Sequence, residues 1–307
     1  MHPGKKYTGI IAPAVTPLTT SYQLDEAAVE KLFTQFYENG ISPYILGTAG
    51  EGPSLPQDAR LNYLITAARC KKPGSVLYAD ISFEDVNQSI DFARLCAAHN
   101  VDVVVASLPL AAAQTESAMR SYFEELAQVV PLPIIIDNTP ATIKTSIPLT
   151  VVDELSMHEN IVAIKDSEQN EERLMKSLEL WKDRRDFGHI LEWEAKSALG
   201  LIAGSDGLMP ATANLCPQVY ATLWSAFRNN DFKQLYAMQQ LSDRYGKLYQ
   251  ANQGQNEQIT TLKVLLQELG ICQSVVLPPL QPLGADAAAT LLQAFSDLAN
   301  EKKETLA

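Results

Sequence analysis

A strand-like segment followed by a helix-like segment recurs eight times between residues 9 and 228, and this alternation constrains the fold most strongly. The strand-like segments are short apolar runs, and the helix-like segments place apolar residues three or four positions apart. Parallel strands need a crossover connection, which an intervening helix supplies, so the alternation predicts a parallel sheet. Eight repeats predict a closed (β/α)8 barrel, the TIM barrel. An open nucleotide-binding sheet would need a G-x-G-x-x-G turn after its first strand, and residues 12–17 contain none.

The expected boundaries follow from apolar spacing and from residues that begin or end helices. Asp25 is the expected N-cap of the first helix, and Gly40 is its expected stop. We expect strands at residues 9–15, 44–46, 76–79, 101–106, 134–136, 161–165, 189–192 and 207–209. We expect helices at residues 25–39, 56–70, 84–99, 115–130, 149–156, 171–181, 195–203 and 217–227.

Beyond the eighth repeat the pattern is helical only. The proline-rich stretch 277–282 cannot continue a helix. Helices are expected at residues 232–253, 256–269 and 286–302. We therefore predict a barrel at residues 1–228 and a C-terminal three-helix extension, residues 229–307, packed on that barrel.

Composition narrows the possible partners. The chain of 307 residues has 24 Lys and Arg against 36 Asp and Glu, and this net charge of −12 argues against a nucleic-acid partner. No apolar run approaches 18 residues and no signal peptide is recognisable, so we expect a cytoplasmic protein with no membrane partner. The cysteines and histidines show no ligand spacing, so we predict neither a metal site nor disulfide bonds.

Lys165 is the first candidate for chemistry, because it ends the apolar run Ile161–Ile164 at the mouth of the predicted barrel. An amine at its usual pKa of about 10.4 is almost entirely charged at pH 7, whereas loss of water lowers the pKa and exposes a nucleophile. A neutral Lys165 can attack a carbonyl carbon and form a Schiff base. The alternative is a strand-end lysine that reaches solvent and pairs with Asp166.

Three further segments next to strands carry residues of interest. The turn Gly47-Thr48-Ala49-Gly50-Glu51 has glycines that let backbone N–H groups approach an anion, with the Thr48 hydroxyl as another donor, although an ordinary turn is the alternative. Residues 136–140 end another predicted strand, and residues 204–207 come just before the last one. Gly207 and Met209, on the last predicted strand, are expected substrate contacts together with Gly47, Thr48 and Ala49.

Four segments together resemble one enzyme family. They are Ala14-Val15-Thr16-Pro17, the turn that begins at Gly47 and continues to Leu55, Asp137-Asn138-Thr139-Pro140, and Ile164-Lys165-Asp166-Ser167. In this order they resemble the dihydrodipicolinate synthase and N-acetylneuraminate lyase family of pyruvate-type class I aldolases. The resemblance implies that Lys165 is the Schiff-base lysine, that Thr48 joins a proton relay, and that the Thr48-Ala49 backbone holds a carboxylate. It also implies a homo-oligomer, commonly a dimer or tetramer.

The sequence departs from that family at several positions. Asp137 stands where the family usually has a tyrosine, and residues 107–110 also lack an expected tyrosine. Thr142 stands near the position of the arginine that dihydrodipicolinate synthase uses for its second substrate, so that activity is not expected. Residues 192–194, Glu-Trp-Glu, are bulky and acidic where the family tends to be small, and they either fill the pocket mouth or form a surface loop.

Two functions follow from these residues. The first is a lyase in which Lys165 condenses with pyruvate or a 2-keto-3-deoxy sugar acid and Asp137 transfers protons, with no cofactor beyond the covalent imine. The second is a catalytically impaired homologue that binds a small carboxylate without turnover. Asp137 leaves both open, because a carboxylate beside Lys165 raises the pKa of the amine, yet a desolvated carboxylate can also act as a general base.

Overall fold

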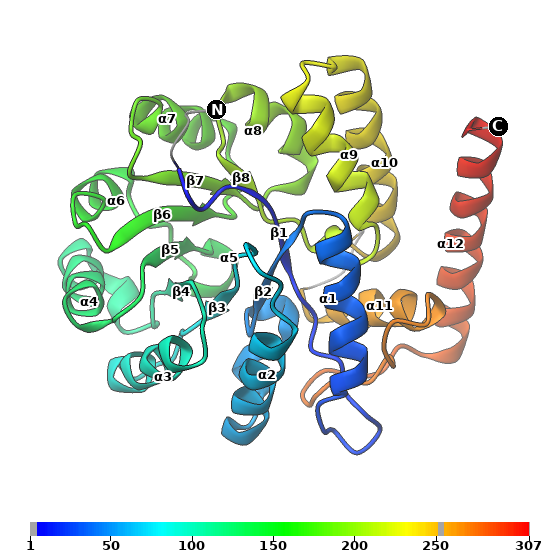
Figure 1. Cartoon of the computed structure of the whole chain (residues 1–307), viewed down its shortest axis with the longest axis horizontal. Coiled ribbons are helices and arrows are strands. Elements are labelled where there is room, and N and C mark those ends of the chain that lie inside the picture. Colours follow the sequence, from blue (N-terminus) through cyan, green and yellow to red (C-terminus); the bar gives the residue numbers. More distant parts are fainter. Residues whose placement is uncertain (1–4, 251–254, 307) are drawn as a thin grey trace. The chain divides into compact units, whose positions relative to one another are not determined.

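A computed structural model describes residues 5–250 and 255–306 of the chain. Eight strands close into a barrel in the order β1 to β8, which confirms the predicted (β/α)8 architecture (Figure 1). Neighbouring strands pair in parallel from β3 through β8, and β8 pairs in parallel with β1. The strands are β1 (Gly9–Pro13), β2 (Ser42–Ile45), β3 (Tyr78–Asp80), β4 (Val103–Ser107), β5 (Ile134–Asn138), β6 (Ile161–Asp166), β7 (Gly188–Leu191) and β8 (Gly207–Leu208).

All eight helices expected between the strands are present. They are α1 (Glu26–Glu38), α2 (Gln57–Cys70), α3 (Val86–Ala98), α4 (Glu116–Val129), α6 (Leu149–Leu155), α7 (Glu171–Trp181), α8 (Ser197–Ala203) and α9 (Pro217–Arg228). Asp25 caps α1 as predicted, since its side chain accepts a hydrogen bond from the Ala28 N–H at 3.1 Å. Helices α3, α4, α6 and α7 lie outside the strands that they connect (Figure 1).

The structure also contains short elements that apolar spacing did not reveal. These are α5 (Pro140–Ile143) and the 3-10 turns η1 (Thr48–Gly50), η2 (Gly52–Ser54), η3 (Ala112–Gln114), η4 (Glu194–Lys196) and η5 (Ala211–Asn214). The first strand ends at Pro13 rather than at Val15, because the Val15 N–H is bonded to the side chain of Asn214 at 3.2 Å.

Residue contacts divide the chain into two compact units. The first unit comprises residues 1–11, 42–44 and 71–210, and the second comprises residues 12–41, 45–70 and 211–307. The second unit contains the C-terminal helices, which the sequence predicted with similar boundaries: α10 (Phe232–Gln250), α11 (Gln255–Glu268) and α12 (Ala285–Leu306). Part of the first predicted helix, residues 251–253, lies outside the described residues. The division at residue 228 stays a prediction.

Within the second unit, α10 packs against α9. The hydroxyl groups of Tyr220 and Ser242 join the two helices at 2.7 Å. None of the helices within residues 5–250 and 255–306 combines the length and apolar character that a bilayer crossing requires.

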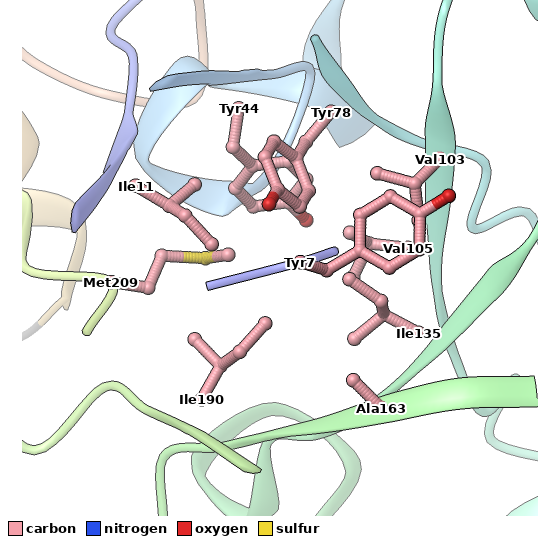
Figure 2. Packing of buried hydrophobic residues seen from close by; sticks show 10 residues of the cluster. All are labelled: Tyr7, Ile11, Tyr44, Tyr78, Val103, Val105, Ile135, Ala163, Ile190 and Met209. Carbon is pink, nitrogen blue, oxygen red and sulfur yellow. The ribbon is translucent and has the colours of Figure 1, made fainter. Parts of the chain in front are cut away.

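The interior of the first unit is an apolar cluster contributed mostly by strands (Figure 2). It contains Tyr7, Ile11, Tyr44, Tyr78, Val103, Val105, Ile135, Ala163, Ile190 and Met209. Side chains alternate between the two faces of a strand, so a residue two positions beyond a cluster member also points inward. This rule places Asp137 after Ile135, Lys165 after Ala163 and Asp80 after Tyr78 on the inner face, at the C-terminal ends of their strands.

Candidate active site

Lys165 lies at the C-terminal end of β6 and is 4% exposed. The strand register pairs it with Asp137 of β5 on one side and with Ile190 of β7 on the other. Strand pairing therefore brings Asp137 and Lys165 together, as expected for two candidate catalytic residues at neighbouring strand ends.

The Lys165 ammonium is held by two carboxylates. Its Nζ donates to Oδ1 of Asp137 at 2.9 Å and lies 2.5 Å from Oε2 of Glu192, which follows β7. The Thr139 hydroxyl also donates to Oδ1 of Asp137, at 2.5 Å. We call Lys165, Asp137, Glu192 and Thr139 the Lys165 cluster. Its lysine and aspartate side chains are 5% and 9% exposed, whereas that of Glu192 is 27% exposed.

The electrostatics of the Lys165 cluster favour the charged amine. Burial by itself lowers the pKa of Lys165, but the carboxylates of Asp137 and Glu192 together outweigh it and raise the pKa above the usual value. Loss of water, together with the charge of Asp137, raises the pKa of Glu192, and the charge of Lys165 opposes this rise. Of the two opposing effects expected at Lys165, the carboxylates therefore outweigh burial, because acids from β5 and from the end of β7 reach the amine.

The alternative pairing of Lys165 with Asp166 was wrong. Asp166 receives hydrogen bonds from Nε of Arg173 at 2.8 Å and from the amide of Asn138 at 2.8 Å. Successive residues of a strand point to opposite faces, so Asp166 and Lys165 face different surroundings.

The turn that contains Gly47, Thr48 and Ala49 belongs to the second unit. Thr48 and Ala49 are half-buried and start η1, and the Thr16 hydroxyl donates to the Gly50 carbonyl at 2.5 Å. Gly52 has no room for a side chain, because a Cβ there would lie 1.6 Å from the carbonyl oxygen of Leu46. The turn thus has a fixed backbone, and its contact with a substrate carboxylate stays a prediction.

The other predicted substrate contacts, Gly207 of β8 and Met209 just after this strand, have different surroundings. A Cβ on Gly207 would lie 2.8 Å from the carbonyl oxygen of Gly9, so close strand packing explains the glycine. Met209 is fully buried in the interior cluster (Figure 2). Packing therefore accounts for both residues, and their contact with substrate stays a prediction.

Comparison with known proteins identifies the family. A model of the dihydrodipicolinate synthetase family matches residues 6–298. The chain belongs to this family. A 4-hydroxy-tetrahydrodipicolinate synthase of Bartonella bacilliformis is 26% identical over 283 residues, covering 88% of this chain and 92% of the relative. An uncharacterised DapA-like lyase of Pyrococcus abyssi is 24% identical over 243 residues, covering 78% of this chain and 82% of that protein.

Solved structures agree with this family assignment. Dihydrodipicolinate synthase from Bacteroides thetaiotaomicron matches with a TM-score of 0.90 at 25% identity, covering 97% of this chain and 100% of the other. The Escherichia coli K12 prophage protein YagE, solved in complex with pyruvate, matches with a TM-score of 0.89 at 24% identity, covering 95% and 99% of the two chains. At 24% identity, the match to YagE shows a similar fold and nothing more.

Two features of this family member escaped the sequence analysis. Glu192 was noted only as part of a bulky, acidic segment that either fills the pocket mouth or forms a surface loop. Its ion pair with Lys165 depends on the path of the chain after β7. Asp80 and Tyr44 were not noticed. Their signal was a phenol that begins one short apolar run, at residues 44–46, and a carboxylate that directly follows the next, at residues 76–79. Their side chains meet in a hydrogen bond of 2.7 Å.

Proposed function

We propose that this member of the dihydrodipicolinate synthetase family is a class I lyase or aldolase that acts on a 2-oxo acid through a Schiff base on Lys165. The observation that supports it most is a buried lysine at the end of β6, within hydrogen-bond distance of two carboxylates that can exchange protons with it. The substrates that fit are pyruvate and 2-keto-3-deoxy sugar acids. Pyruvate-bound relatives support the choice of a 2-oxo acid.

Glu192 is the proposed acceptor for the proton that Lys165 must lose before it attacks. Transfer of this proton gives a neutral amine and a neutral carboxyl group, which removes two charges from a site with little water. The raised pKa of Glu192 favours this transfer. The amine then adds to the keto carbon, and the Glu192 proton leaves with the former keto oxygen as water. The product is a protonated imine, and Glu192 is a carboxylate again.

Asp137 is the proposed general base for the next step. Asp137 accepts the proton of the substrate hydroxyl, and the adjacent C–C bond breaks. The electron pair of this bond moves into the protonated imine, which gives an aldehyde and an enamine. The same proton then returns to the enamine carbon, and water releases pyruvate from Lys165. Asp137 lies 2.9 Å from the nitrogen at which the positive charge resides, so its carboxylate stabilises the iminium.

Reduction with borohydride in the presence of pyruvate tests the proposal. The imine is converted to a stable secondary amine, so the intact protein gains the mass of one reduced pyruvate. Lys165→Met removes the amine and should give no adduct, whereas Lys176→Met, at an exposed surface lysine paired with Glu172, should react like the wild type. Absence of an adduct across a panel of 2-oxo acids would contradict the proposal.

The two ion pairs of Lys165 favour a second candidate, a protein that binds a small carboxylate without turnover. In this case the amine stays an ammonium that attracts the ligand and never attacks it. The two functions differ in one measurement, because both predict a rise in melting temperature with pyruvate but only the lyase forms a reducible adduct. The role of Thr48 in carboxylate binding is tested in either case by Thr48→Val, which should weaken pyruvate binding.

A further inference from the structure

Thr139 precedes the short helix α5, but its hydroxyl does not cap that helix. A threonine at this N-cap position usually accepts a hydrogen bond from a backbone N–H two or three residues further on. The side chain of Thr139 forms no such bond, and its hydroxyl donates to Oδ1 of Asp137 at 2.5 Å instead. Thr115, the N-cap of α4, shows the usual arrangement, because its hydroxyl oxygen accepts the Ala118 N–H at 3.1 Å. Capping therefore does not explain the hydroxyl of Thr139.

The chain between Asp137 and Thr139 has a fixed path. Asn138 is fully buried, its amide donates to Asp166 at 2.8 Å, and its side-chain oxygen accepts the Ile147 N–H at 2.9 Å. In an extended chain the residues on either side of Asn138 point the opposite way from it. Asp137 and Thr139 thus lie on the same side of the chain, and they are 6% and 8% exposed.

The two oxygens of the Asp137 carboxylate have different partners. Oδ1 accepts hydrogen bonds from Nζ of Lys165 at 2.9 Å and from the Thr139 hydroxyl, and two donors fill its two lone-pair sites. Within residues 5–250 and 255–306, Oδ2 accepts no hydrogen bond and forms no ion pair. Oδ2 is therefore the oxygen that is available to a substrate.

We propose that Thr139 is a positioning residue that holds Oδ1 of Asp137 and leaves Oδ2 as the atom that accepts the proton. This inference rests on the proposed function. In the cleavage step the proton of the substrate hydroxyl moves to Oδ2, and the electron pair of the C–C bond moves into the protonated imine. Oδ2 then gives its proton to the enamine carbon. The Thr139 proton stays on its own oxygen throughout, so the threonine contributes orientation and no bond change.

This orientation matters most after the imine has formed. The Lys165 nitrogen is then bonded to the substrate carbon and has fewer protons to donate, which weakens its hold on Oδ1. The hydrogen bond from Thr139 does not depend on the state of the amine. It therefore keeps the carboxylate aligned during the proton transfers, and alignment of a reacting group has a large effect on rate.

Exchange of the pyruvate methyl protons in D2O measures the step that uses Oδ2. In the reverse of the last transfer, Oδ2 takes a proton from the methyl group of the imine, and deuterium from the solvent replaces this proton before the return to carbon. Thr139→Val replaces the hydroxyl with a methyl group and should slow the exchange, followed by NMR, about tenfold, as expected for a lost hydrogen bond to a charged group. Borohydride trapping of the imine should stay within about twofold of the wild type and keep its midpoint pH, because the charges around Lys165 are unchanged.

Two variants serve as controls. Thr139→Ser keeps the hydroxyl and should exchange within about threefold of the wild type. Thr115→Val removes a hydroxyl that does cap a helix, so it should lower the melting temperature and leave the exchange rate unchanged. If Thr139→Val does not fold, Thr139→Ala removes the hydroxyl without the added methyl group and gives the same test.

The outcomes separate the inference from the proposed function. A wild-type protein that forms no adduct, or that forms the adduct and exchanges no methyl proton, overturns the proposed roles of Lys165 or Asp137 and the inference with them. An adduct with exchange unchanged in Thr139→Val, or slowed equally in Thr139→Ser, overturns the inference alone. Slowed exchange in Thr139→Val, with the imine still trapped and near-normal exchange in Thr139→Ser, supports both.

Discussion

Two buried lysines, Lys165 in the first unit and Lys263 in the second, have opposite surroundings. Lys263 is 0% exposed and, within residues 5–250 and 255–306, pairs with one acid, Glu51, whose second oxygen accepts the Leu277 N–H at 2.6 Å. The Lys263 ammonium also donates to the Val275 carbonyl at 2.7 Å. Charge is balanced there, and each charged group has further hydrogen bonds, as expected for a structural ion pair.

Lys165 instead faces two carboxylates, with the uncompensated acid Asp80 linked to them electrostatically. Acids therefore outnumber cations around Lys165, and stability alone does not favour such an arrangement. Burial of a lysine therefore does not by itself identify a nucleophile. An excess of acid, which lets protons move within the site, distinguishes the lysine proposed for chemistry from the one that holds loops together.

The largest effect on stability is expected at the balanced pair. Lys263→Met leaves Glu51 charged, buried and unpaired, so the free energy of unfolding should fall by about 3–5 kcal/mol. Urea unfolding measures this change. The companion Glu51→Gln/Lys263→Met variant removes the stranded charge and should recover part of the loss. If the free energy of unfolding of Lys263→Met lies within about 1 kcal/mol of that of the wild type, Lys263 is not a structural residue.

A smaller, pH-dependent effect is expected at Asp80. Its pKa is about 6 in the folded protein against about 3.9 unfolded, so the unfolded chain releases this proton first as the pH rises. The contribution of Asp80 to the free energy of unfolding is therefore fully present below about pH 4. It falls by about 3 kcal/mol as the pH rises to about 6. Asp80→Asn should show a correspondingly shallower decline in urea unfolding across this range. Parallel curves for the two proteins would show that Asp80 does not titrate there.

Asp137→Asn is expected to shift the pH dependence of borohydride trapping with pyruvate. Removing one carboxylate from the Lys165 ammonium lowers the pKa of the amine, by about 1–3 units for a charge this close. The midpoint of borohydride trapping with pyruvate should therefore move to lower pH. A midpoint that stays in place would mean that Asp137 does not control the charge of Lys165.

The smallest effect is expected at an exposed ion pair. Arg69 contacts Glu26 and Glu30 on the surface, and its side chain is 53% exposed. Water and salt screen such pairs, so Arg69→Ala should leave the urea midpoint unchanged. A large loss here would show that exposure does not separate structural from incidental ion pairs in this chain.

The sequence predicted the barrel because the alternation of apolar runs and helical spacing is a local signal. The same signal located Lys165 and Asp137 at strand ends, and the register of β5 and β6 then brought them together. The sequence left the charge of Lys165 open between burial and Asp137, and it did not predict the second carboxylate, because Glu192 reaches Lys165 through a turn of the chain that no spacing rule describes. The hydrogen bond between Tyr44 and Asp80 joins residues 36 positions apart, so local spacing could not predict it. That Asp80 has no ion pair among the described residues depends on the folded surroundings and not on its neighbours in the sequence.

Peptide mapping after borohydride reduction locates the covalent bond on the chain. The protein is reduced with borohydride in the presence of pyruvate, digested, and each lysine-containing peptide is weighed by mass spectrometry. A Schiff base on Lys165 should leave one reduced pyruvate on the peptide that contains Lys165 and none on the peptide that contains Lys263. An unmodified Lys165 peptide, or modification only at other lysines, would contradict it.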